Sequence, residues 1–82
     1  MRWSIRAEPT ENVRATDVRF EAEMMYVRLA DGRELGVPLE WFPTLRGATP
    51  AERAHWELIG QGVGIHWIDL DEDLSVAGLL GQ

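Results

Sequence analysis

Two alternating segments of the chain meet at the dipeptide Asp31-Gly32. Residues 24–30 and 33–39 carry apolar side chains at every second position, as strands with one buried face do. Glycine accepts the positive φ of a tight two-residue turn, so this arrangement predicts a β-hairpin. Residues 13–20 also alternate and are followed by the turn-like tripeptide EAE. We therefore predict an antiparallel three-stranded meander over residues 13–39. The side chains expected on its apolar face are Thr16, Val18, Phe20, Met25, Val27, Leu29, Leu35, Val37 and Leu39.

The apolar face of such a meander needs a cover, because a sheet buries one face against another element. In residues 39–48, Pro43 permits at most a short helix. The segment Thr49-Pro50-Ala51-Glu52 has a helix N-cap, a proline at the first helical position and the glutamate of a capping box. Apolar residues then recur at helical spacing, which predicts a helix over residues 50–58 that covers the meander.

The remaining segments complete the expected fold. Residues 65–70 are predicted to be a strand or extended segment, and Ser75 is predicted to cap a short C-terminal helix. We expect a single small α+β domain over residues 12–82, with an antiparallel three-stranded β-meander packed by short helices. Residues 1–11 form an N-terminal extension, either an edge strand or a tail.

Composition excludes several classes of chemistry. The chain has no cysteine, so disulfides, thiolate metal sites and cysteine nucleophiles are excluded. It has no lysine either, which excludes a phosphate-binding P-loop and a Schiff base. No segment has the length and apolarity of a membrane helix or of a signal peptide. We expect a cytoplasmic protein without a membrane partner and without a cofactor.

The net charge of −6 is distributed unevenly. Residues 1–55 hold all eight arginines and nine acids, whereas residues 56–82 hold five acids and no basic residue. Binding to a nucleic-acid backbone needs clustered positive charge, so this domain alone is not expected to bind nucleic acid. A small basic protein is the expected partner, and a homodimer is the other assembly considered.

The acids near the C-terminus offer two interpretations. Asp69, Asp71 and Asp73 imitate the start of an EF-hand loop, but the glycine and the glutamate required further on are replaced by Leu74 and Leu80. We expect these acids to be solvated in front of the terminal helix, whose N-terminus favours negative charge. The alternative is a small metal-dependent enzyme or metal-binding protein that uses His55, His66 and the acids of residues 69–73.

The tryptophans also permit two roles. Trp41, Trp56 and Trp67, with Phe42, are expected mainly in the core, but an exposed aromatic residue is a common anchor of a protein interface. No residue set points to catalysis, so no catalytic, cofactor or metal residue is predicted. The candidate residues for a partner interface are Trp41, Trp67, Asp69, Asp71, Glu72 and Asp73.

Three segments carry a family resemblance: LADGRE (29–34), PLEWFP (38–43) and HWIDLDEDLSVAGLL (66–80). With the stretches between them they resemble the bacterial domain of unknown function twenty-four forty-two, DUF2442. Typical members have proline where this chain has Ile68. The resemblance implies a small α+β domain with no established activity or catalytic residues. It also implies frequent encoding beside another small protein, in a pairing of toxin–antitoxin type. The functional hypothesis is a non-catalytic protein-interaction or regulatory module, the antitoxin-like half of such a two-protein system.

Overall fold

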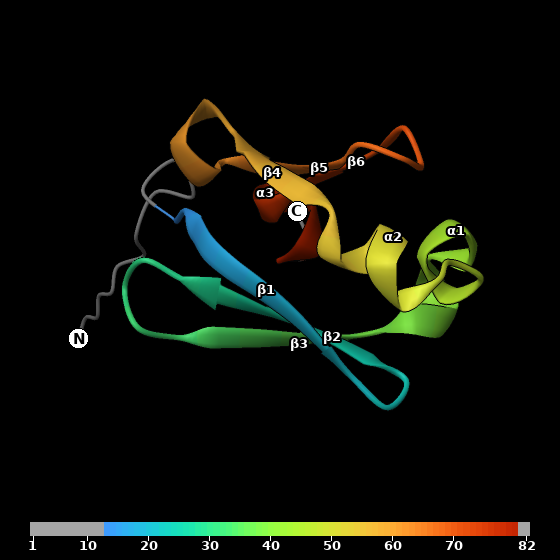
Figure 1. Cartoon of the computed structure of the whole chain (residues 1–82). Helices are drawn as coiled ribbons and strands as arrows, with labels where there is room; N and C mark the ends of the chain where they lie inside the picture. Colours follow the sequence, from blue (N-terminus) through green and yellow to red (C-terminus); the bar gives the residue numbers. More distant parts are fainter. Residues whose placement is uncertain (1–12, 81–82) are drawn as a thin grey trace.

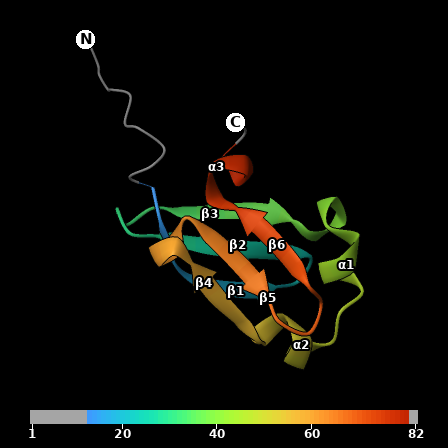
Figure 2. The same cartoon turned by 90° about the horizontal axis from the view of Figure 1, so that it is seen from above.

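The computed structural model describes residues 13–80, and the predicted N-terminal extension, residues 1–11, lies outside them. Two three-stranded antiparallel sheets lie one above the other, with the two short helices of residues 43–54 at one end (Figure 1). Sheet A consists of β1 (Ala15–Glu21), β2 (Met24–Leu29) and β3 (Glu34–Pro38), and sheet B of β4 (Trp56–Ile59), β5 (Gly64–Trp67) and β6 (Glu72–Ser75). The short helices are η3 (Leu39–Trp41), α1 (Pro43–Arg46), α2 (Pro50–Ala54), η4 (Gly60–Gly62) and α3 (Val76–Leu79). Seen from above, sheet B crosses over sheet A, and α3 lies on the side of the molecule where β3 is the edge strand (Figure 2).

Sheet A confirms the predicted meander. Its strands pair in the order β1-β2-β3, and Met25, Val27 and Leu29 are buried on the face toward sheet B. The turn at Asp31-Gly32 is present, with Gly32 at φ +97°, but it is longer than a two-residue loop. The amide of Leu29 donates to the carbonyl of Arg33 at 2.8 Å, which leaves three residues between them. Glycine at the left-handed position is typical of such a loop.

Thr16 does not face the core as predicted. The β1–β2 register shifts between Ala15 and Asp17, so an irregularity of the β-bulge type interrupts the alternation. Ala15 and Val18 are therefore buried, while Thr16 and Asp17 are both exposed.

The helix predicted over residues 50–58 is wrong in its second half. The capping box at its start is confirmed, because the amide of Glu52 donates to Thr49 Oγ1 at 3.1 Å and the amide of Thr49 to Glu52 Oε1 at 2.9 Å. The helix ends at Ala54, however, and residues 56–59 form β4, which pairs with β5. The cover of sheet A is therefore a second sheet with short helices, and not the predicted helix.

The C-terminal segment also differs in part from the prediction. The extended segment expected over residues 65–70 ends at Trp67 and turns back into β6. Ser75 caps α3 as predicted, since its Oγ accepts the amide of Gly78 at 3.1 Å. Asp71, Glu72 and Asp73 precede that helix as expected, but Glu72 and Asp73 belong to strand β6. Across residues 13–80, no helix is long and apolar enough to cross a membrane.

The core lies between the two sheets and is centred on Trp67, which has an exposed fraction of 0%. The ring of Phe20 from sheet A meets the Trp67 indole edge-on, with 6.4 Å between the ring centroids. The indole Nε1–H donates to the carbonyl of Arg53 at 3.0 Å. Arg53 in turn donates from Nε and Nη2 to the carbonyls of Leu45 and Arg46, both at 2.8 Å. One arginine thus connects sheet B, α2 and the end of α1.

Candidate protein interface

The outer face of sheet B, which points away from sheet A, is the strongest candidate for a binding surface. Side chains on successive strand positions point to opposite faces. Trp56, Ile65 and Trp67 pack inward. The pairing of β4 with β5 and of β5 with β6 sets Glu57 and Asp73 opposite His66, and Ile59 and Ser75 opposite Gly64. The outer face of sheet B is therefore defined by Glu57, Ile59, Gly64, His66, Asp73 and Ser75.

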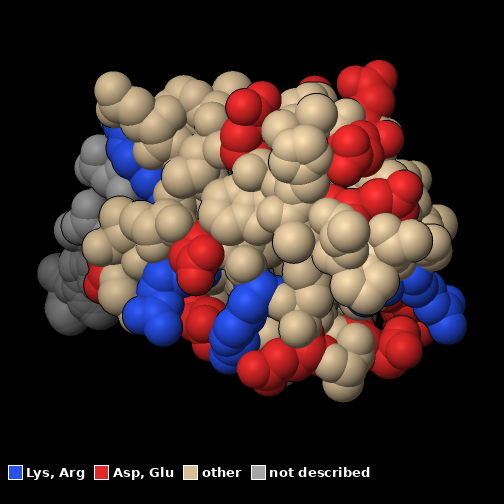
Figure 3. Space-filling view, viewed as in Figure 1, with Lys and Arg blue, Asp and Glu red and all other residues tan. Residues whose placement is uncertain are grey.

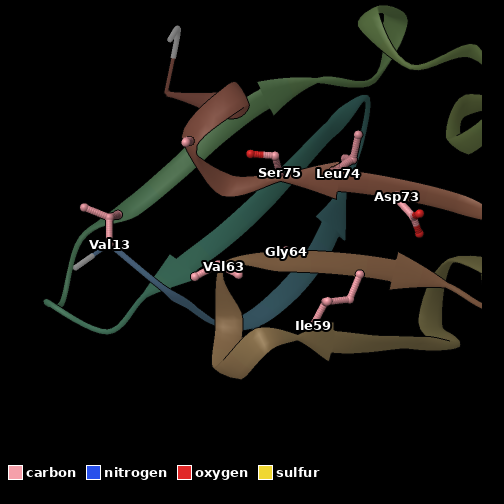
Figure 4. Close-up of a pocket in the computed structure, with 8 residues that line it drawn as sticks. Val13, Ile59, Val63, Gly64, Asp73, Leu74 and Ser75 are labelled. Carbon is pink, nitrogen blue, oxygen red and sulfur yellow. The ribbon is translucent and has the colours of Figure 1, made fainter. Parts of the chain in front are cut away.

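One end of this face opens into a hollow that also reaches Val13, before β1, and Ala77 of α3 (Figure 4). The hollow has a volume of about 510 Å³, with Ile59 and Val63 on one side and Asp73 and Ser75 on the other. Gly64 lies between them and is itself buried, with the side chain of Ile59 packed against it. A Cβ at this position would lie 3.3 Å from the Leu74 carbonyl oxygen and 3.5 Å from Ile59 Cβ. Ile59 and Val63 are 42% and 41% exposed, so the apolar side of the hollow is accessible.

The other end of the face carries a row of three ionisable side chains, Glu57, His66 and Asp73, one on each strand. His66 Nδ1 is hydrogen-bonded to Asp73 Oδ1. The side chain of His66 is 24% exposed and that of Asp73 is 68% exposed. The hydrogen bond to Asp73, supported by the negative charges of Glu57 and Asp71, raises the pKa of His66 above its ordinary value of 6.5. Protonated His66 therefore offsets part of the negative charge of this row.

The raised pKa of His66 predicts a pH dependence of stability. A group whose pKa is higher in the folded state stabilises that state below its unfolded pKa, and this contribution is lost as pH rises through the folded pKa. We expect the free energy of unfolding to fall as the pH rises above the ordinary histidine pKa of about 6.5 and through the raised pKa of folded His66. Urea unfolding at a series of pH values measures this change. His66→Gln should remove the part due to His66, and an identical pH profile in that variant would contradict the assignment.

The second histidine belongs to a separate pair. His55 Nδ1 lies 2.9 Å from Asp69 Oδ2, with side chains 54% and 45% exposed. The amide of Ile68 donates to the His55 carbonyl at 3.2 Å, which holds this pair at the end of β5 where the β5–β6 turn begins. The two histidines considered as metal ligands thus pair with different acids, His55 with Asp69 and His66 with Asp73. His55, His66 and Asp69 therefore do not form one cluster. In residues 13–80, no group of three His, Asp or Glu side chains is arranged to hold a metal ion.

The structure places the six predicted interface residues in different environments. Trp41 is 64% exposed in η3, away from the hollow, whereas Trp67 is completely buried and is excluded from any surface of the folded domain. The expectation that Trp67 lies in the core is therefore confirmed, and its candidacy as an interface residue is wrong, because β5 directs it inward. Asp69 and Asp71 are exposed in the β5–β6 turn, where Asp71 has a φ of +51°. Glu72 is half-buried in β6, and Asp73 lies on the outer face.

Four residues of this surface, Glu57, Ile59, Val63 and Gly64, are not among the predicted interface residues, because the sequence predicts a helix up to residue 58 and no strand between that helix and residue 65. One signal was available: Glu57 separates two apolar residues, as in a strand with one buried face. Figure 3 shows acidic side chains gathered at the upper right, over the β5–β6 end of sheet B, without a basic side chain among them. The charge asymmetry inferred from the sequence is therefore also an asymmetry of the surface.

The fold defines a small α+β domain made of two three-stranded sheets. The chain belongs to the family described as "Protein of unknown function (DUF2442)", whose model matches residues 15–82. A protein of unknown function from Rhodospirillum rubrum, solved by crystallography, is 34% identical with a TM-score of 0.71, and the match covers 83% of this chain and 84% of that chain. An uncharacterised protein from Chromobacterium violaceum, solved by NMR, is 29% identical with a TM-score of 0.70, and the match covers 82% of this chain and 63% of that one. No curated protein matches the chain.

Proposed function

We propose that this domain is a non-catalytic protein-interaction or regulatory module that binds a small basic protein through the outer face of sheet B. The observation that carries the proposal is the combination, on this face, of the accessible apolar hollow beside Ile59 and Val63 with the acids Glu57 and Asp73. Apolar area that can be desolvated supplies binding energy, and complementary charge supplies orientation and partner selection.

The charge of the C-terminal part supports a basic partner. All five ionised side chains of residues 56–82, apart from histidine, are acids. A surface of one sign attracts a partner of the opposite sign and repels like-charged proteins and nucleic acid. The family resemblance adds the expectation of a second small protein encoded nearby. An antitoxin-like role in such a pair is the form of regulation we propose.

Affinity purification of the tagged protein from its native host tests this proposal. We expect one small basic protein to co-elute with the parent protein. This basic protein should no longer co-elute with the double variant Glu57→Gln/Asp73→Asn, which removes two negative charges from sheet B. The matched control is Asp17→Asn/Glu40→Gln, which makes the same change in charge on exposed residues outside sheet B. Elution of the parent as a homodimer without a second protein, or equal retention of a partner by both variants, would contradict the proposal.

Thermal unfolding distinguishes the proposal from the metal-dependent alternative. We expect calcium, magnesium, manganese and zinc to leave the melting temperature unchanged, because His55 and His66 pair with different acids. An ion bound at a specific site and present at 100 times its dissociation constant would add about 2.7 kcal/mol to the free energy of unfolding. In so small a domain this corresponds to a rise of many degrees. A saturable rise that disappears in Asp71→Asn/Asp73→Asn would favour the metal-dependent alternative.

A further inference from the structure

On the basis of the interaction role proposed above, we propose that the outer face of sheet B receives an extended segment of the partner lying along β5. An aliphatic side chain of this segment occupies the hollow at the level of Gly64, against Ile59 and Val63. Two residues further along, an arginine or lysine side chain lies over His66, between Glu57 and Asp73. The partner motif is thus an aliphatic residue and a basic residue separated by one position.

The spacing of β5 carries the first step of this inference. Gly64 and His66 are two residues apart on the same face of one strand, which places them about 6.6–6.8 Å apart along it. Side chains at positions i and i+2 of an extended segment have the same separation and also point to one side. A partner segment that lies along β5 therefore presents one side chain to the hollow. The side chain two residues further on lies over the row of Glu57, His66 and Asp73. Adjacent residues would point in opposite directions and cannot occupy both places.

The chemistry of the two places determines which side chains fit. The hollow has an exposed apolar side formed by Ile59 and Val63, and Ile59 packs against Gly64. An aliphatic side chain fills such a space and covers two exposed apolar residues. The row beside it has a carboxylate on each flank, Glu57 on β4 and Asp73 on β6, with His66 between them. A cationic side chain above His66 would meet both carboxylates. Arginine suits this position best, because its planar guanidinium can bond two carboxylates at once.

Protonation of His66 competes with the partner's cation. The charged groups that face His66 are Glu57 from β4, Asp73 from β6 and Asp71 from the β5–β6 turn. Protonated His66 satisfies part of their negative charge, whereas neutral His66 leaves that charge to the incoming arginine or lysine. Binding of the cation must therefore lower the pKa of His66, and affinity must decrease as the pH falls through that pKa.

Two synthetic peptides of identical composition test the motif on the complete protein. The peptide acetyl-GTSLTRTSG-amide separates leucine and arginine by one residue, and acetyl-GTSLRTTSG-amide makes them adjacent. Binding is followed by NMR chemical shifts at low salt. We expect the first peptide to shift the resonances of Ile59, Gly64 and His66 and to lower the pKa of His66. The second peptide should bind about fivefold more weakly, the factor that about 1 kcal/mol represents.

Variants decide whether the site is the one proposed. Glu57→Gln/Asp73→Asn should abolish the difference between the two peptides, whereas Asp17→Asn/Glu40→Gln should retain it. Thermal unfolding of each variant checks that the fold is intact. Equal affinity of both peptides for the parent protein, or shifts confined to other surfaces, would overturn the inference. If the natural partner still depends on Glu57 and Asp73 in that case, the proposed function stands without this motif. If the peptides discriminate but no partner co-elutes from the host, the proposed function fails and the motif remains.

Discussion

Gly62→Ala is expected to destabilise the domain by about 2–6 kcal/mol, which combines about 1–3 for a left-handed residue with about 1–3 for a steric conflict. Gly62 has a φ of +106°, a conformation that alanine rarely adopts. A Cβ at this position would also lie 2.4 Å from the backbone oxygen of Ala15, so β1 or η4 would have to move. This glycine allows the β4–β5 connection to approach sheet A. The change is measured by urea unfolding of the purified variant.

Gly32→Ala is the matched control for Gly62→Ala. Gly32 also has a positive φ, +97°, but a Cβ there would meet no atom within 4 Å. The Gly32→Ala variant therefore measures only the free-energy cost of placing alanine in a left-handed conformation. The difference in unfolding free energy between the two variants then gives the cost of the steric conflict between η4 and β1. Equal destabilisation by the two substitutions would show that the contact between Gly62 and Ala15 does not constrain the packing of the sheets.

Trp67→Ala is expected to cost about 3–5 kcal/mol, because it removes a large side chain from the centre of the core. Trp67 is completely buried and contacts sheet A through Phe20. A domain of 82 residues has a total stability of about 4–12 kcal/mol, so this loss is enough to unfold much of the protein. Circular dichroism and chemical denaturation at one temperature measure the effect.

Trp67→Phe removes the hydrogen bond while it retains more of the packing than alanine does. Phenylalanine keeps an aromatic ring but removes the Nε1–H donor, so the Arg53 carbonyl loses its partner. The expected cost is about 1–3 kcal/mol, as for a buried polar group left unsatisfied. This variant should fold, which keeps the role of Trp67 measurable when the alanine variant does not. A stability equal to that of the parent would contradict the proposed role of the indole N–H.

The sequence predicted the candidate interface only in part. The excess of acids after residue 55 and the surface position of Asp73 follow from composition and polarity alone. Glu57 and Ile59 could not be placed on the same face as Asp73, because β4 and β6 meet only through their pairing with β5. The row that contains His66 joins residues 57 and 73, and local periodicity carries no information about such pairing. For the same reason the sequence leaves Trp67 with two possible places, the core and an interface, and only the pairing of β5 decides for the core.

Local chemistry determined the meander of sheet A, the capping box at Thr49 and the Ser75 cap, since each depends on residues close together in the chain. Residues 56–59 are different, because their apolar spacing continues a helical pattern and also suits a strand. Tertiary structure decides between the two. Left-handed backbone at Gly60, Gln61 and Gly62 turns the chain back, and pairing with β5 buries Trp67 against sheet A. The burial of this tryptophan and the closure of a second sheet are non-local, which is why they outweigh the helical tendency of one short segment.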